Sequence, residues 1–306
     1  MEVKKSVLIT GGAGTVGMSF IEKYYNKYEF YNISRNEKGI AELSQKFPKV
    51  KNYVGDILNL DRLINLFELI KPDIVIHSAA LKHVNLAEEN PTSAVEINIR
   101  GSLNVIKASI RAQVPITVGV STDKACDPDN VYGYTKKIME KMFMEHHNLR
   151  TKFVCTRFAN VANSNGSVIP FWKNLKKQKN PLRLTSPKMN RLMFSKEASA
   201  KLIYDACEFA EIMEKPFILS NVMKTVNMLD LAKIISNKID VVGLRPGEKL
   251  NETLVRKKEL PYTKVCKDLI FIFNDIKLNF GDNLKKEHSS LTAEKMTMIE
   301  MKKLIK

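Results

Sequence analysis

Short runs of apolar residues alternate with longer amphipathic stretches over the first half of the chain. In the stretches between the runs, apolar residues recur at helical spacing, a pattern typical of parallel strands joined by crossover helices. Because the runs are apolar at nearly every position, both faces of these strands are expected to be buried. The predicted strands are residues 7–10, 30–34, 50–54, 74–80, 116–121 and 153–157. The sequence therefore predicts an α/β fold, a doubly wound parallel sheet of about six or more strands.

The pattern changes after residue 161, where the loop sequence SNGS is followed by a lysine-rich helix. We expect residues 1–160 to form the larger domain, with 195–220 returning to it. Residues 161–194 and 221–306 are expected to form a smaller lobe packed against it, and the cleft between the two is the expected site. The elements predicted in this half are strands at 182–185 and 217–220 and helices at 195–209, 227–238, 248–255 and 291–305.

The composition is that of an ordinary globular protein, with 44% hydrophobic and 27% charged residues in a chain of 306. The four cysteines are widely separated and no His/Cys group has the spacing of metal ligands, so reduced thiols and no metal are expected. No segment approaches the 18 or so apolar residues that a membrane helix needs. The expectation is a soluble, cytoplasmic protein.

The formal net charge is +16, from 49 basic and 33 acidic residues, and 39 of the basic residues are lysine. Proteins that read bases and phosphates rely more on the bidentate arginine side chain. We therefore interpret the excess as a solvated lysine surface and expect no nucleic-acid partner.

A glycine-rich turn directly follows the first predicted strand and opens a helix. Gly11 permits the tight turn, Gly14 lets the backbone approach a pyrophosphate, and Gly17 allows close packing of helix on strand. The N–H groups of Thr15 and Val16 then lie at the helix N-terminus, where the helix dipole favours phosphate. The turn predicts a dinucleotide site, the alternative being a tight turn without a ligand.

The end of the second predicted strand indicates which dinucleotide binds. Ser34 and Arg35 stand where an NAD enzyme usually places a carboxylate, and a hydroxyl beside a guanidinium suits a 2′-phosphate. The prediction is NADP rather than NAD, unless Arg35 is only a surface charge. Other residues expected near the cofactor are Asp56, Ile57, Ala79, Ala80 and Asn98.

A tyrosine and a lysine four residues apart begin the helix after the fifth predicted strand. Tyr132 and Lys136 then lie on one helix face, where the ammonium lowers the phenol pKa and holds the cofactor ribose. Thr122, at the end of the strand, is placed to bind the same substrate hydroxyl. A Y-x-x-x-K spacing alone also describes a surface pair; behind a glycine turn it indicates dehydrogenase chemistry.

At this point the chain resembles the extended short-chain dehydrogenase/reductases, with their Rossmann fold, and more narrowly the UDP-N-acetylglucosamine 4,6-dehydratases of the polysaccharide-biosynthesis family. The specific motifs are the T-D-K triplet of Thr122, Asp123 and Lys124 and the R-P-G-E-K box at 245–249. The resemblance also rests on GGAGTVG, SRNE, GDI, HSAALKHV, NIRGSLNVI, STDKACDPDNVYGYTK, TRFANVANSNGSVIPFW, GLRPGEKLNE and HSSLTAEKM.

The resemblance implies roles for these residues. Tyr132 takes the proton of the sugar 4-hydroxyl, Lys124 removes the C5 proton of the resulting ketone, and Asp123 protonates the departing 6-hydroxyl. Hydride stored on the cofactor returns to C6, so the cofactor is recycled. Such a base must be neutral and such an acid protonated, which a closed cleft of low dielectric favours over an ion pair.

Fixed cations are needed to bind the substrate diphosphate, and arginine has the better shape for it. Arg245 is the first candidate and Arg191 the second, while Glu248 either contacts the substrate or complements a helix N-terminus, as does Glu252. The resemblance further places Lys82 and His83 near the sugar, and Asn160, Ser167 and Val168 near the pyrophosphate and uridine. It also places Lys82 and Asn160 near the cofactor.

The leading hypothesis is an NADP-dependent, 5-inverting UDP-N-acetylglucosamine 4,6-dehydratase that supplies a deoxy amino sugar for a surface glycan. The resemblance implies a homo-oligomer. Two enzymes of the same superfamily, a UDP-sugar 4-epimerase and a 4-ketoreductase, remain open, as do retention at C5 and the sugar accepted. A non-catalytic nucleotide-binding or basic scaffold protein is the alternative of another class.

Overall fold

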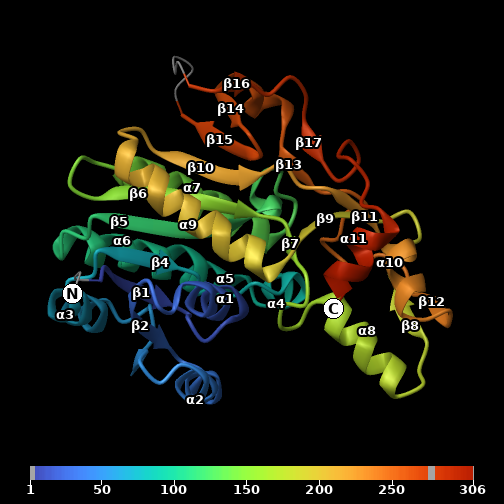
Figure 1. The fold of residues 1–306 in the computed structure, drawn as a ribbon, viewed down its shortest axis with the longest axis horizontal. Coiled ribbons are helices and arrows are strands. Elements are labelled where there is room, and N and C mark those ends of the chain that lie inside the picture. The colour runs from blue at the N-terminus through green and yellow to red at the C-terminus, as the bar shows by residue number, and fades with distance from the viewer. Residues whose placement is uncertain (1–3, 275–279, 306) are drawn as a thin grey trace.

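A ten-stranded sheet forms the centre of the molecule in the computed structural model, which describes residues 4–274 and 280–305 (Figure 1). Seven neighbouring strands are parallel and lie in the order β3-β2-β1-β4-β5-β6-β10. They are β1 (Ser6–Thr10), β2 (Glu29–Ser34), β3 (Lys51–Val54), β4 (Ile74–His77), β5 (Ile116–Thr122), β6 (Lys152–Phe158) and β10 (Phe217–Asn221). The chain order reverses between β1 and β4, which opens a crevice at the carboxyl edge of the sheet.

Helices cover both faces of the sheet, as its apolar strands require. On one face α1 packs against α9, and on the other α6 packs against α3 and α7. The fully buried Phe20 and Phe143 belong to the cores on these opposite faces. The helical elements are α1 (Thr15–Tyr24), α2 (Glu37–Lys46), α3 (Leu60–Ile70), α4 (Val84–Glu89), α5 (Pro91–Val95), η1 (Glu96–Arg100), α6 (Gly101–Arg111), η2 (Asp123–Ala125), α7 (Val131–His146) and α9 (Lys196–Ile212).

Three further strands extend the sheet beyond β10 and run antiparallel to their neighbours. They are β15 (Leu269–Phe273), β14 (Thr263–Cys266) and β16 (Asp282–Asn283). The division expected from the sequence placed all of residues 221–306 in the smaller lobe, and the structure differs here. Buried Phe271 packs edge-on against Phe209 of α9, so this hairpin completes the core of the main sheet.

The smaller lobe consists of short sheets and helices around a separate core. Trp172 is its largest buried side chain, and its indole N–H donates to the Arg183 carbonyl at 2.9 Å. In these sheets β9 pairs with both β11 and β7, β12 pairs with β8, and β13 pairs with β17. The elements are β7 (Asn160–Val161), α8 (Val168–Lys177), β8 (Leu182–Leu184), β9 (Asn190–Phe194), β11 (Thr225–Asn227), α10 (Met228–Ile235), β12 (Ile239–Val241) and α11 (Met298–Ile305). The segments β13 (Thr253–Val255), η3 (Lys257–Tyr262) and β17 (His288–Ser289) join this lobe to the main sheet, since Leu254, Val255 and Leu260 pack in the main-sheet cores.

Two predicted helices were wrong in whole or in part. The helix expected at 248–255 is absent; this segment ends in β13, because Thr253 and Val255 pair with the residues of β17. The helix expected at 291–305 is shortened to α11, since Met296 donates its N–H to the Thr225 carbonyl and ties the preceding chain to β11. In both places pairing with a distant strand replaces a local helix.

Candidate active site

A cleft of about 1120 Å³ lies at the carboxyl edge of the parallel strands, between the main sheet and the smaller lobe. Four of the residues predicted for the site do not line it: Gly17, Asp56, Asn98 and Asp123. The others line it: Gly11, Gly14, Thr15, Val16, Ser34, Arg35, Ile57, Ala79, Ala80, Lys82, His83, Thr122, Lys124, Tyr132, Lys136, Asn160, Ser167, Val168, Arg191, Arg245 and Glu248. Segments far apart in sequence therefore meet at one edge of the sheet.

The glycine turn has the geometry that phosphate binding requires. Gly11 has φ +76°, and a Cβ there would lie 3.0 Å from the backbone of Ala79, so only glycine fits. Gly14 is the N-cap of α1 and has no side chain to accept the N–H groups of the first turn. Those N–H groups are therefore available to an anion. A Cβ at Gly17 would lie 2.5 Å from the Cα of Gly12, so glycine there allows close packing of the helix. Gly17 does not line the cleft.

Arg35 and Asp56 form an exposed ion pair at the edge of the cleft. Their nearest side-chain atoms lie 3.2 Å apart, and Asp56 Oδ1 accepts the backbone N–H of Leu58 at 3.0 Å. Asp56 does not line the cleft; its carboxylate binds the Arg35 guanidinium and stabilises its own turn. Arg35 does line the cleft, so Arg35 and Ser34 both line this edge of it.

Asn98 is buried and does not line the cleft. Its side-chain amide bonds both backbone groups of Leu81, at 2.8 and 3.0 Å, and donates to Thr135 Oγ1 at 3.0 Å. These bonds join the loop after β4 to α7. Asn98 therefore positions the walls of the site rather than touching a ligand in it.

The T-D-K triplet lies where β5 ends in Thr122 and the single turn η2 begins. Asp123 is 1% exposed, and its Oδ1 accepts from the Thr122 hydroxyl at 2.9 Å, the Lys124 N–H at 2.9 Å and Lys124 Nζ at 3.1 Å. Its Oδ2 is buried and has no hydrogen-bond partner among the described residues. One oxygen is thus saturated and the other is available.

Lys124 lies between two carboxylates rather than one. Its Nζ is 3.1 Å from Asp123 and 3.3 Å from Glu252, which reaches in from the smaller lobe. Burial alone would lower the pKa of Lys124, but the two carboxylates raise it above its ordinary value. In this arrangement the two carboxylates favour the ammonium form of Lys124, whereas the sequence-based expectation was an uncharged amine.

On the first turns of α7, Lys136 is buried and Tyr132 is half-buried. The Asn130 side chain caps this helix by accepting the Gly133 N–H at 2.8 Å, and a Cβ at Gly133 would lie 2.5 Å from the Lys124 carbonyl. Glycine at this position lets the helix start close to the T-D-K turn. The geometry brings Tyr132 next to the residues of η2.

The charges around the phenol differ from those expected. Burial raises the pKa of Tyr132 to about 12, and the cation that opposes this rise is Lys124 rather than Lys136. Burial lowers the pKa of Lys136 to about 8, and its Nζ lies 3.1 Å from Met139 Sδ. The expectation that Lys136 depresses the phenol pKa is not met in this structure.

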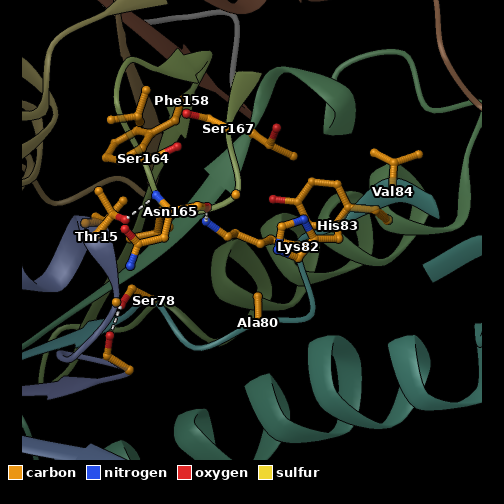
Figure 2. A pocket seen from close by; sticks show the side chains of 18 of the residues that line it. Thr15, Ser78, Ala80, Lys82, His83, Val84, Phe158, Ser164, Asn165 and Ser167 are labelled. Carbon is orange, nitrogen blue, oxygen red and sulfur yellow. Dashed lines mark hydrogen bonds between the residues drawn. The ribbon is translucent and has the colours of Figure 1, made fainter. Parts of the chain in front are cut away.

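The loop containing Asn165 crosses the cleft (Figure 2). Its N–H donates to Thr15 Oγ1 at 2.9 Å, and its carbonyl accepts from Lys82 Nζ at 2.9 Å. Burial lowers the pKa of Lys82, and burial with Lys82 lowers that of His83. Sequence reasoning did not select Asn165, although its place in the SNGS loop was a usable signal.

The R-P-G-E-K box forms a tight turn beside the start of α7. Gly247 has φ +73°, Glu248 accepts the Arg245 N–H at 3.1 Å, and the Asn130 amide donates to the Gly247 carbonyl at 3.1 Å. Glu248 thus closes a turn and caps no helix. Arg191 is buried and donates to the carbonyls of residues 249 and 250, at 2.8 and 3.1 Å, while lining the cleft.

Asn160, Ser167 and Val168 lie where β7 and α8 face the cleft. Ser167 begins α8 with no side-chain cap, and its hydroxyl is buried without a partner among the described residues. Hydrogen-bonding capacity therefore remains at this helix N-terminus.

No helix in the described ranges, 4–274 and 280–305, is long and apolar enough to cross a bilayer. Within those ranges no cluster of three or more His, Cys, Asp or Glu side chains has the arrangement of a metal site.

Comparisons with known proteins agree with this geometry. The family model described as "Polysaccharide biosynthesis protein" matches residues 7–274. A UDP-N-acetylglucosamine 4,6-dehydratase (inverting) of Campylobacter jejuni serotype O:2 is 33% identical, covering 92% of this chain and 86% of its own. A UDP-glucose 4-epimerase of Rickettsia bellii is 34% identical, covering 85% and 80%.

Among solved structures, Pen from Bacillus thuringiensis has 31% identity and a TM-score of 0.91, covering 99% of this chain and 97% of its own. The match spans both the main sheet and the smaller lobe. The chain therefore belongs to the polysaccharide biosynthesis protein family, among the short-chain dehydrogenase/reductase enzymes of the nucleotide-sugar dehydratase and epimerase type.

Proposed function

We propose that this enzyme is an NADP-dependent, 5-inverting UDP-N-acetylglucosamine 4,6-dehydratase. The observation that carries the proposal is that Lys124 and Tyr132 line the cleft that also contains the glycine turn, with the buried Asp123 bonded to Lys124. A 4-epimerase needs a base at the 4-hydroxyl, whereas loss of water across C5 and C6 also needs an acid and a second base. This chain supplies all three groups.

The residues of the cleft fit a dinucleotide. The first turn of α1 would offer its N–H groups to the pyrophosphate, Lys136 of α7 would bind the ribose, and Arg35 would bind the 2′-phosphate. Bound NADP would accept the C4 hydride and later return it to C6. The groups proposed for the UDP diphosphate are Arg191 and Arg245, with the N-terminus of α8 beside them.

Three side chains would move the protons of the reaction. Tyr132 takes the proton of the 4-hydroxyl, with Thr122 bonded to the same oxygen. The ketone then acidifies C5–H, which Lys124 removes. Asp123 protonates the departing hydroxyl through Oδ2, the oxygen without a partner among the described residues.

The test is incubation with UDP-N-acetylglucosamine followed by mass spectrometry and NMR. The expected product is lighter by one water, carries a 4-ketone and an inverted C5, and forms without net consumption of NADPH. Retained configuration at C5 would make the enzyme a retaining dehydratase, and net NADPH consumption would indicate a 4-ketoreductase.

The second candidate is a UDP-sugar 4-epimerase, which the Rickettsia bellii relative named UDP-glucose 4-epimerase favours. The same incubation decides between the two. A C4 epimer that has lost no water would establish the epimerase and overturn the dehydratase.

A further inference from the structure

Glu252 is a buried carboxylate that lines the cleft and that no step above uses. It is 4% exposed, and its Oε1 lies 3.3 Å from Lys124 Nζ. It comes from the smaller lobe, one residue before β13, whereas Lys124 comes from the main sheet. Sequence reasoning assigned it at most to a helix N-terminus, but no helix begins there.

The backbone of Glu252 is fixed on both sides by one residue. Ser290 donates its N–H to the Glu252 carbonyl at 2.8 Å, and its hydroxyl accepts the Glu252 N–H at 2.9 Å. Ser290 is itself 1% exposed. The carboxylate is therefore held at Lys124 by two segments of the chain.

The ammonium form of Lys124 creates a requirement that Glu252 meets. An ammonium ion has no lone pair, so its proton must go to an acceptor before the amine can act as a base. Asp123 Oδ1 already accepts from three donors, including Lys124 Nζ. Glu252 is the second carboxylate within reach of Lys124 Nζ, at 3.3 Å.

The charges that act on Glu252 come from two other elements. Lys124 and Asp123 lie on η2, and Arg191 lies on β9. Burial raises the pKa of Glu252, Asp123 raises it further, and the two cations oppose this, with a raised pKa as the result. A carboxylate with a raised pKa accepts a proton from an amine more readily than an ordinary one does.

On the basis of the proposed dehydratase function, we propose that Glu252 accepts the Lys124 proton, so that the neutral amine becomes the C5 base. An N–H bond of Lys124 breaks and an O–H bond forms on Glu252. The amine then takes the C5 proton, the C–H electron pair forms the C5–C6 double bond, and hydroxide leaves C6 with the proton of Asp123 as water.

The cluster holds the same number of protons after elimination as before it. Before elimination Lys124 is an ammonium ion, Glu252 is ionised and Asp123 carries the acid proton. After elimination Lys124 is again an ammonium ion, Glu252 is protonated and Asp123 is ionised. Because Lys124 lies within 3.3 Å of both carboxylates, it can give a proton to Asp123 and take one from Glu252, which restores the starting state. Glu252 therefore acts on the reaction only through Lys124, whose proton it accepts, and is a positioning residue.

The experiment compares wild type with Glu252→Gln, using dehydration of UDP-N-acetylglucosamine between pH 6 and 10. Near neutral pH kcat is expected to fall about 100-fold, because general base catalysis is lost, while KM stays within about threefold. The loss should shrink as pH rises, since solvent hydroxide can then deprotonate Lys124. Exchange of the C5 hydrogen with deuterated solvent should slow in parallel.

Reduction of bound cofactor in a single turnover should survive in Glu252→Gln, because Tyr132 carries that step. Glu252→Asp, which shortens the carboxylate, is expected to lose less activity with the same pH dependence. The control is Glu294→Gln, which removes an exposed carboxylate paired with Lys224 and should leave all rates unchanged.

A loss that is equal at every pH, or that includes cofactor reduction, would reduce Glu252 to a packing role and overturn the proposal. Activity equal to wild type at neutral pH would overturn it as well. If wild type itself forms no dehydrated product, the proposed function is wrong, and this role falls with it.

Discussion

Two buried clusters of charge lie a short distance apart in sequence and differ in how completely their hydrogen bonds are satisfied. In the first, Arg157 on β6 is 0% exposed and binds Glu140 through two bonds of 2.9 and 2.8 Å and Glu259 through two of 3.0 Å. A fifth bond goes to the Leu254 carbonyl at 2.9 Å. In the second, around Lys124, Asp123 Oδ2 has no partner in the described part of the chain.

The difference separates a structural charge from a chemical one. Arg157 uses all its guanidinium N–H groups and cannot exchange a proton, so its cluster only joins β6, α7, β13 and η3. Lys124 keeps 17% of its side chain exposed, lines the cleft and has two carboxylates within reach. Burial of charge alone therefore does not mark an active site, whereas a group that can exchange a proton and that lines a cleft, as Lys124 does, indicates one.

The largest effect is expected from Lys124→Ala in the open cluster. Elimination and C5 exchange should fall by about 10²–10⁴-fold, because the base is gone, while cofactor binding persists. Stopped-flow absorbance measures elimination, and deuterium incorporation measures exchange at C5. Lys141→Ala, which removes an exposed lysine of α7, is the control. Exchange at C5 at the normal rate would show that Lys124 is not the base.

In the closed cluster, Arg157→Leu should destabilise the fold by about 3–5 kcal/mol, because Glu140 and Glu259 lose their buried partner. Urea unfolding followed by circular dichroism measures this. Arg111→Leu breaks an exposed pair with Glu68 and should change stability by less than about 0.5 kcal/mol. Equal effects of the two substitutions would remove the contrast between buried and exposed charge.

The closed cluster also predicts a pH dependence of stability. Burial opposes ionisation of Glu259, but Arg157 outweighs it and lowers the pKa from 4.5 to about 2. Its stabilising contribution is therefore complete above pH 4.5 and is lost as pH falls through about 2. Urea titrations across this range should show a smaller loss of stability in Glu259→Gln, and identical slopes would contradict the assignment.

The smallest effect is expected at an exposed pair. Arg35→Ala should weaken NADP binding about tenfold and leave NAD binding unchanged, because only the 2′-phosphate contact is removed. Fluorescence titration with each dinucleotide measures this ratio. Lys38→Ala, an exposed cation on the neighbouring helix α2, serves as the control. A parallel loss for both cofactors would place Arg35 away from the phosphate.

The fold of the first half could be predicted well, because the predicted strands correspond to β1–β6 within a few residues. Periodicity failed where pairing is long-range. The segment at 248–255 has an apolar spacing compatible with a helix, yet β13 pairs with β17 more than thirty residues later. Local preference is weak there, so a distant strand decides the conformation.

By itself the sequence determined the alternating strands and helices, the glycine turn and the residue types of the T-D-K and Y-x-x-x-K motifs, because these depend on local spacing and chemistry. Only the tertiary structure decided which groups face one another. It placed Glu252 at Lys124, withdrew Asp56 and Asn98 from the cleft, and left Lys124 charged. The physical reason is that a pKa and a contact depend on distances between segments, which spacing along one chain does not specify.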